Sequence, residues 1–392
     1  MSISAPLRAL CVVVLSCGLF LRTAHALVSL NDGTDKIFVS GTFTMGYSTN
    51  ITASAQQIGD TTYAASGAIE YQRRAGLIAV NANVSFSLTD YFKNRTYDSL
   101  NPAFGVEFDK TTGRTTGTLN LNAQRSSQAD AAANTRDISW NYSAGLNLHY
   151  PVIERYSFTA SFGYGLLDFI DKGNLPLVNL STYTATLGLF YVLTDDRDLF
   201  ADYRYRYEQT SASEGSLDNS LSLGVSGKII WEINGSLSVG YQIRTPRGMP
   251  ADGLPQEAEH AITAAASASW AMNRKTTFSA SLSRDFSTTS LGATTDTTAA
   301  TLDLKYAYNA KLAPGAGIGG GESDFLGPLG LLAGTNVERR DYYITWNASI
   351  SYAWFGARLG SSLSYAHFHN WSNLGLASFS SDSLSLSLST RW

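Results

Sequence analysis

The feature that most constrains this chain is a strict alternation of apolar and small polar residues, repeated from residue 37 to the C-terminus. Between Ile138 and Tyr150, apolar residues occupy every second position, and Ser, Asn, Gly and His fill the positions between them. The segment from Tyr342 to Trp354 repeats this pattern. A period of two places successive side chains on opposite faces of a β-strand. The sequence therefore predicts strands that have one apolar and one polar face.

These segments are long for strands of a soluble sheet, which usually have about five or six residues. A tilted strand needs about nine to eleven residues to cross a bilayer. Helices cannot make the crossing, because each needs about 20 consecutive apolar residues and the mean hydropathy of the chain is only -0.07. The strand length thus favours a protein that crosses a membrane with strands.

Periodicity predicts strands along the whole chain. In order they are 37–47, 61–71, 77–88, 103–109, 116–124, 138–150, 156–167, 180–193, 199–208, 218–229, 235–244, 259–272, 276–286, 298–308, 341–354, 358–368 and 381–392. In lipid, every backbone N–H and C=O must be paired within the protein, so a membrane sheet has to close on itself. We expect a closed antiparallel up-and-down barrel over 37–392. A secreted soluble β-sandwich or β-helix is the alternative.

The connections alternate between short and long, as the two ends of outer-membrane barrels require. The predicted tight turns are 73–76, 111–114, 151–155, 194–198, 231–234, 273–275 and 355–358. The predicted loops are 89–102, 125–137, 168–179, 209–217, 245–258 and 369–380. The turn at 355–358 falls at the wrong end unless one more strand lies within 311–335. Because bacterial barrels have an even strand count, we predict 18 strands, with 16 as the alternative, and both termini in the periplasm.

The first 26 residues have the features of a cleavable signal peptide. Arg8 precedes an apolar stretch, and the small-residue site Ala24-His25-Ala26 follows it. Cleavage leaves 27–36 as a periplasmic N-terminal segment. It also removes Cys11 and Cys17, the only cysteines, and so excludes disulfides and thiolate chemistry. Acylation at Cys17 is an alternative that the better-formed cleavage site disfavours.

The C-terminal strand has a pattern of its own, in which Leu386 and Leu388 alternate toward the terminal aromatic residue Trp392. This pattern resembles the signal by which barrel-assembly machinery recognises its clients. We therefore expect that machinery and the outer-membrane lipid as partners. Nucleic acid is not expected, because loss of Arg8 and Arg22 leaves 26 of the 28 basic residues against 32 acidic ones.

Charged residues on the polar face are the candidates for functional sites, since ionisable groups inside a barrel select which solutes pass. The candidates at inward positions are Asp202, Arg204, Arg206, Glu208, Arg244, Asp285, Asp303, Lys305 and Arg391. They carry both signs. Two interpretations stay open, a selectivity role and a salt-bridged ladder that stiffens the wall between strands.

Three further motifs give weaker signals. Residues 315–320 match the G-x-G-x-x-G pattern, but no βαβ unit surrounds them, so a flexible loop is expected. The longer segment 309–340 is the longest irregular stretch, and one hypothesis has it folding inward as a constriction. His367 and His369 share a strand face, which is weak spacing for a metal site. We predict no cofactor, no metal and no enzymatic function.

Two short stretches near the mature N-terminus carry a resemblance to a known family. They are Asp32-Gly33-Thr34-Asp35-Lys36-Ile37-Phe38-Val39 and Gly46-Tyr47-Ser48-Thr49-Asn50-Ile51. The chain resembles a family of outer-membrane β-barrel porins, type two, of Gram-negative bacteria. Tyr203-Arg204-Tyr205-Arg206-Tyr207 and Gly240-Tyr241 are similar in style. The resemblance implies an outer-membrane location and a passive pore, with no catalytic residues.

We therefore expect a channel for small hydrophilic solutes or ions. An occluded anchoring barrel, or the membrane part of a polysaccharide-export system, is the alternative. Trimers are common among porins, but the sequence leaves the oligomeric state undecided.

Overall fold

The structure is a computed structural model. It describes residues 27–171, 177–212, 215–230, 232–247, 257–326, 338–354 and 358–392. The predicted signal peptide lies outside these residues. No helix in the described part of the chain is long and apolar enough to span a membrane.

The described chain consists almost entirely of antiparallel strands. The first nine are β1 (Val28–Leu30), β2 (Asp35–Ser48), β3 (Asp60–Arg73), β4 (Ala79–Tyr91), β5 (Ser99–Lys110), β6 (Thr116–Asp130), β7 (Thr135–Ile153), β8 (Tyr156–Asp171) and β9 (Leu180–Thr194). The others are β10 (Arg197–Thr210), β11 (Ser216–Ile230), β12 (Ile233–Pro246), β13 (Glu259–Ala271), β14 (Thr276–Thr288), β15 (Thr294–Tyr306), β16 (Leu312–Leu326), β17 (Arg340–Trp354), β18 (Leu359–Ser372) and β19 (Phe379–Arg391). Three short 3-10 helices complete them, η1 (Asn31–Gly33), η2 (Arg95–Tyr97) and η4 (Gly375–Ala377).

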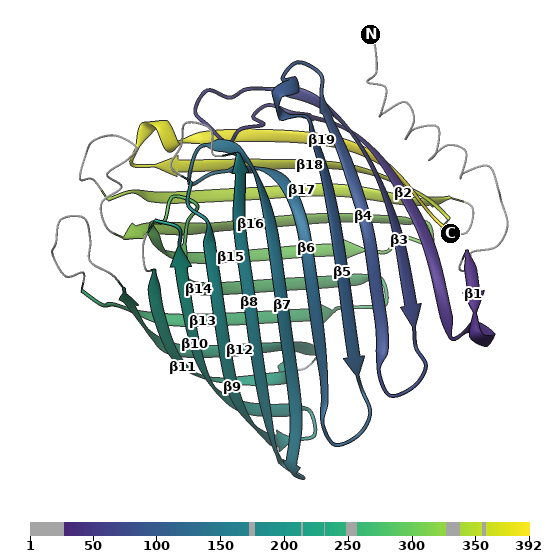
Figure 1. Ribbon diagram of the computed structural model, residues 1–392, viewed down its shortest axis with the longest axis vertical. Helices are drawn as coiled ribbons and strands as arrows, with labels where there is room; N and C mark the ends of the chain where they lie inside the picture. The colour runs from purple at the N-terminus through teal and green to yellow at the C-terminus, as the bar shows by residue number, and fades with distance from the viewer. Residues whose placement is uncertain are drawn as a thin grey trace.

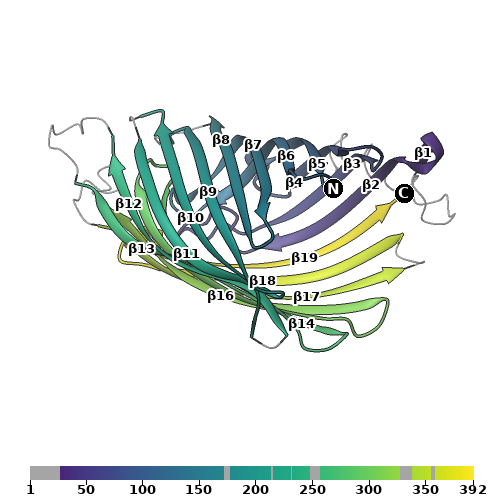
Figure 2. The same cartoon turned by 90° about the horizontal axis from the view of Figure 1, so that it is seen from below.

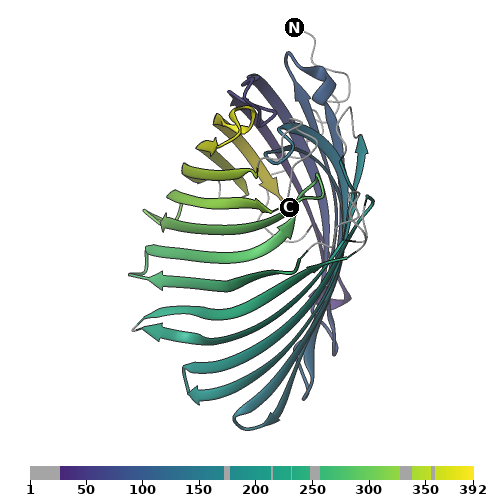
Figure 3. The same cartoon turned by 90° about the vertical axis from the view of Figure 1, so that its left-hand side faces the viewer.

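Each strand from β2 to β19 pairs with its neighbours in chain order, and β19 pairs with β2 to close the sheet. At this seam, Leu386 lies opposite Met45. The predicted all-β closed barrel of 18 strands is thereby confirmed. Figure 1 shows one wall, built from the earlier strands, crossing in front of the wall built from the later ones, and Figure 3 shows the two walls side by side. Figure 2 shows β9 and β10, where one wall passes into the other.

The strand that periodicity alone could not locate is β16, and it lies within the expected window 311–335. Its inward positions are held by glycines, including Gly315, Gly317 and Gly319, so the apolar–polar contrast that marks the other strands is absent. The expected flexible loop at 315–320 is therefore wrong. The inward-folding constriction proposed for 309–340 is also wrong for β16, and 327–337 lie outside the described residues.

Some predicted boundaries need correction for a physical reason, because strand pairing continues beyond the regular sequence pattern. Most of the predicted loop 125–137 is strand, since β6 and β7 stay paired as far as Asp130 and Thr135. The predicted turn 151–155 is shorter, because a register shift at Pro151 carries β7 on to Ile153. In the predicted N-terminal segment 27–36, β1 pairs with the start of β2.

The pairing also assigns the two faces of the wall. Side chains directly opposite each other in an antiparallel pair share a face, so the inner face can be followed from strand to strand. The outer face carries exposed apolar side chains such as Leu187, Leu221 and Leu223. Tyr150, Tyr342 and Trp354 lie on the outer face at strand ends, as girdle residues would. The inner face carries mainly Ser, Thr, Asn and Gly.

Candidate functional site

The first four candidate charges lie on one face of β10. Asp202, Arg204, Arg206 and Glu208 alternate with the exposed side chains of Tyr203 and Tyr205. Arg204 forms a bidentate pair with Asp285 of β14, with both N···O distances 2.8 Å. Three strands separate β10 from β14 in the sheet. Side chains so far apart can meet only on the concave side of a curved wall, so this face of β10 lines the lumen.

Six of these inner-face side chains form one ion-pair network, here called the charged cluster. Its members are Arg204, Arg206, Glu208, Asp218, Arg244 and Asp285. Arg206 contacts Asp218 at 2.5 Å and also reaches Asp285 at 3.3 Å. Arg244 contacts Glu208 at 2.6 Å and Asp218 at 3.2 Å. Three arginines thus face three carboxylates, and the cluster has no net formal charge.

The charged cluster is withdrawn from solvent at its centre. Arg244 and Asp218 are each only 1% exposed, and Glu208 is 5% exposed. Removing charges from water costs several kcal/mol for each ion, so such a group persists only when partners surround it. Gln242, also 1% exposed, accepts a hydrogen bond from Arg204 and adds to these partners.

Sequence reasoning missed Asp218 and Gln242. Asp218 lies directly opposite both Arg206 and Arg244 in the sheet, and Gln242 lies on the same face as Arg244, two residues away. Following inward positions on each neighbouring strand, rather than only on β10, would have found both.

The other candidate charges lie outside the charged cluster. Asp202 lies opposite Gly188, and Asp303 and Lys305 lie opposite Gly317 and Gly315 of β16. Among the described residues, none of these three charged side chains has an ion-pair partner. Arg391 pairs with Glu70 at 2.7 Å and lies over the ring of Phe38, near the end of the barrel where the chain enters and leaves it.

At the opposite end, loops meet across the barrel mouth. Arg339, just before β17, has no exposed surface. It pairs with Asp341 and donates to the carbonyl oxygens of Ala131 (2.9 Å) and Ala132 (2.7 Å) in the β6–β7 turn. The same turn supplies Ala133 to a buried apolar cluster with Phe169 and Leu177, against which Leu291 packs. Connections from four places in the chain therefore converge over this mouth.

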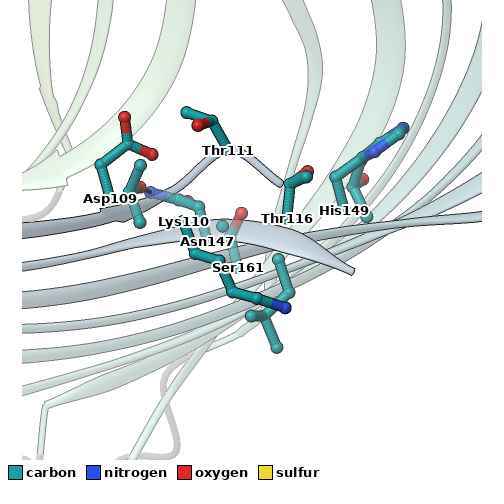
Figure 4. A pocket seen from close by; sticks show the side chains of 11 residues that line it. Asp109, Lys110, Thr111, Thr116, Asn147, His149 and Ser161 are labelled. Atoms are coloured by element: carbon teal, nitrogen blue, oxygen red, sulfur yellow. Dashed lines mark hydrogen bonds between the residues drawn. The ribbon is translucent and has the colours of Figure 1, made fainter. Parts of the chain in front are cut away.

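A polar recess of about 420 Å³ lies near the other end of the lumen, on the wall of β5 to β8. Figure 4 shows Asp109 and His149 at its two sides, with Thr116, Asn147 and Ser161 between them. Asn147 donates to Thr118 Oγ1 across the strand pair at 3.3 Å. The lining residues therefore carry hydroxyl, amide, imidazole, ammonium and carboxylate groups.

The two candidate histidines lie on the outer face of β18. His367 is 2.8 Å from the carboxylate of Asp382, and its ring also lies near Trp346. His369 packs on Trp371. No group of three or more metal-ligating side chains occurs in the part of the chain that the structure describes.

The C-terminal residues of the predicted assembly signal form the seam of the barrel. Leu386 and Leu388 lie on the outer face of β19, opposite residues of β2. Trp392 exchanges two backbone hydrogen bonds with Val39, of 2.8 and 2.9 Å.

Comparison with known proteins defines the fold further. No protein-family model matches the chain, and no curated protein matches its sequence. The structure is similar to that of Pseudomonas aeruginosa OccK2 (OpdF), with a TM-score of 0.51 and 11% identity, over 91% of this chain and 97% of that one. OccK2 in complex with glucuronate gives the same values. Pseudomonas aeruginosa OpdO gives a TM-score of 0.50 with the same identity and coverage. The chain therefore has the fold of these proteins along nearly its whole length.

Proposed function

We propose that this protein is an outer-membrane channel through which small hydrophilic solutes or ions diffuse passively. The observation that carries the proposal is the continuous polar face inside a closed 18-strand barrel. A barrel of this size has room for an aqueous channel. The exposed apolar side chains on the outside supply the surface that lipid requires, and a sheet without an edge satisfies its backbone there.

The similar structures support the same function. OccK2 has been crystallised in complex with glucuronate, a small hydrophilic solute. Passive diffusion through this chain needs neither a cofactor nor a catalytic residue, and we propose no enzymatic role. The lipid of the outer membrane is one proposed partner. The barrel-assembly machinery is the other, engaged through Leu386, Leu388 and Trp392 on the closing strand.

The second candidate function is an occluded barrel with an anchoring or structural role. The convergence of loops at the mouth favours it, because Arg339 ties the β6–β7 turn to the opposite wall. Phe169, Ala133 and Leu177 then exclude water beside that contact.

Conductance of the purified protein in a planar bilayer separates the two functions. A steady ohmic current is expected from a channel, whereas a silent bilayer that contains folded protein would establish the occluded barrel. Folding is verified independently by heat-modifiable migration on a denaturing gel.

Two single-cysteine variants test whether the current passes through the lumen. The mature chain expected after cleavage has no cysteine. We expect a charged, water-soluble thiol reagent to reduce the current of Ser143→Cys, because Ser143 lies on the inner face opposite Asn122. The matched control is Ala144→Cys, one residue along on the outer face. Equal responses of both variants would contradict a lumen path.

A further inference from the structure

On the inner face of the barrel, the arginines and the carboxylates differ in whether they have an ion-pair partner. All its arginines in the described chain are matched by carboxylates. Arg204, Arg206 and Arg244 are neutralised within the charged cluster, Arg339 by Asp341 and Arg391 by Glu70. To pair with any one of these guanidinium groups, an anion in the lumen would compete with the carboxylate already bound to it.

The charges left without an ion pair are mostly acidic. On the inner face of the described strands, two carboxylates without an ion pair are buried, Asp60 and Asp137. The others reach solvent, and they are Glu107, Asp109, Asp130, Asp198, Asp202, Glu259 and Asp303. The corresponding basic residues are Lys36, Lys228 and Lys305. A lumen lined mainly by one sign of charge concentrates ions of the opposite sign and repels those of its own sign.

Two of the unpaired carboxylates lie close together on the wall beside the polar recess. Glu107 and Asp109 are two residues apart on the inner face of β5, and Asp109 lines the recess. Lys110, which also lines the recess, forms no ion pair with either carboxylate, and its ammonium donates to the carbonyl oxygen of Thr115 at 2.8 Å. Glu107 has only an amide partner, Asn81. Both carboxylates are therefore available to passing solutes.

We propose that the lumen selects cations over anions and that Glu107 and Asp109 are its main selectivity residues. This inference rests on the proposed channel function. The hydroxyl and amide groups of Thr118, Asn147 and Ser161 replace part of the hydration shell of a cation beside Asp109. Small cations that carry hydroxyl or amino groups are accordingly the favoured solute class.

The test is the reversal potential of the purified, full-length mature protein in a planar bilayer under a KCl gradient. Low ionic strength is chosen, because salt screens exposed charges within about 10 Å at 0.1 M. The reversal potential is expected to lie toward the potassium equilibrium value. The double variant Glu107→Gln/Asp109→Asn should move it toward the chloride value, and Lys305→Gln should move it the opposite way.

The matched control is Glu322→Gln, which removes a carboxylate from the outer face of β16 and should leave the reversal potential unchanged. Glu107→Gln alone serves as the second variant if the double variant folds poorly. A wild-type reversal potential toward chloride, or an equal shift in Glu322→Gln, would overturn the selectivity and leave the channel intact. Absence of any current would overturn both.

Discussion

Two parts of the inner wall differ in how their carboxylates are paired. Near the loop end of β10 to β14, arginines and carboxylates interlock in the charged cluster, and Arg244 is almost fully buried. Near the turn end of β5 to β8, Glu107 and Asp109 stand without an ion pair beside an open recess. In the first region, ion pairs connect side chains from four strands. In the second region, side-chain hydrogen bonds connect only neighbouring strands.

The two regions differ in which residues share the inner face. On β10 to β14, arginines and carboxylates lie within reach of one another and are neutralised. On β5 to β8, the inner face carries no arginine or lysine, so Glu107 and Asp109 stay unpaired and face the lumen. Four substitutions test how firmly the inner wall is packed and paired, and their expected effects differ in size.

Arg244→Ala should have the largest effect on stability. It leaves Glu208 and Asp218 buried with one partner fewer, and breaking a buried ion pair costs about 3–5 kcal/mol. Unfolding by urea in lipid vesicles measures the loss. The matched control is Arg284→Ala, because Arg284 pairs with Asp296 on the outer face and is 44% exposed. The control should lose about 0–1 kcal/mol, and an equal loss in both variants would remove the distinction between buried and exposed pairs.

Arg339→Lys should weaken the contact that holds the β6–β7 turn over the mouth. A lysine can keep Asp341 but lacks the planar fork that reaches Ala131 and Ala132. We expect a loss of about 1.5–3 kcal/mol and more frequent open states in single-channel records. Arg340→Lys is the control, because Arg340 is the exposed neighbour of Arg339 and pairs with Asp324 on the outer face. Unchanged opening in Arg339→Lys would show that this contact does not restrict the mouth.

Gly240→Ala should overpack the inner face of β12. A Cβ there would lie 2.4 Å from the carbonyl oxygen of Leu221 and 2.7 Å from Ser222 Cβ. Overpacking of this kind costs about 1–3 kcal/mol. At Gly163, on the inner face of β8, the nearest atom would be Thr184 Cβ at 3.8 Å. Gly163→Ala should therefore leave the free energy of unfolding unchanged or raise it by up to about 1 kcal/mol. Similar losses at both positions would contradict the difference in crowding.

Arg204→Gln should have the smallest effect. Asp285 loses its bidentate partner but keeps Arg206 at 3.3 Å, so we expect a loss of about 1 kcal/mol. The partly freed carboxylate should also move the reversal potential slightly toward the potassium value. A shift toward chloride would contradict this expectation, because the loss of a guanidinium leaves the inner face more negative.

Sequence reasoning predicted most of the fold because its rules act locally. Alternation with a period of two identified the strands, and the alternation of turns and loops required the strand that became β16. Its position was hidden because inner glycines such as Gly317 carry no side chain to mark a polar face. The extension of β6 and β7 was missed because backbone pairing continues where the side-chain pattern fades.

The candidate site could be predicted only in part. The sequence by itself determined which charges lie on the inward face, since the face depends only on the parity of each position. It could not determine that Arg204 meets Asp285 from four strands away while Asp303 and Asp202 meet no arginine. Those outcomes depend on how sharply each part of the wall bends and on where the loops pack. Both are settled only when all the strands close into one barrel.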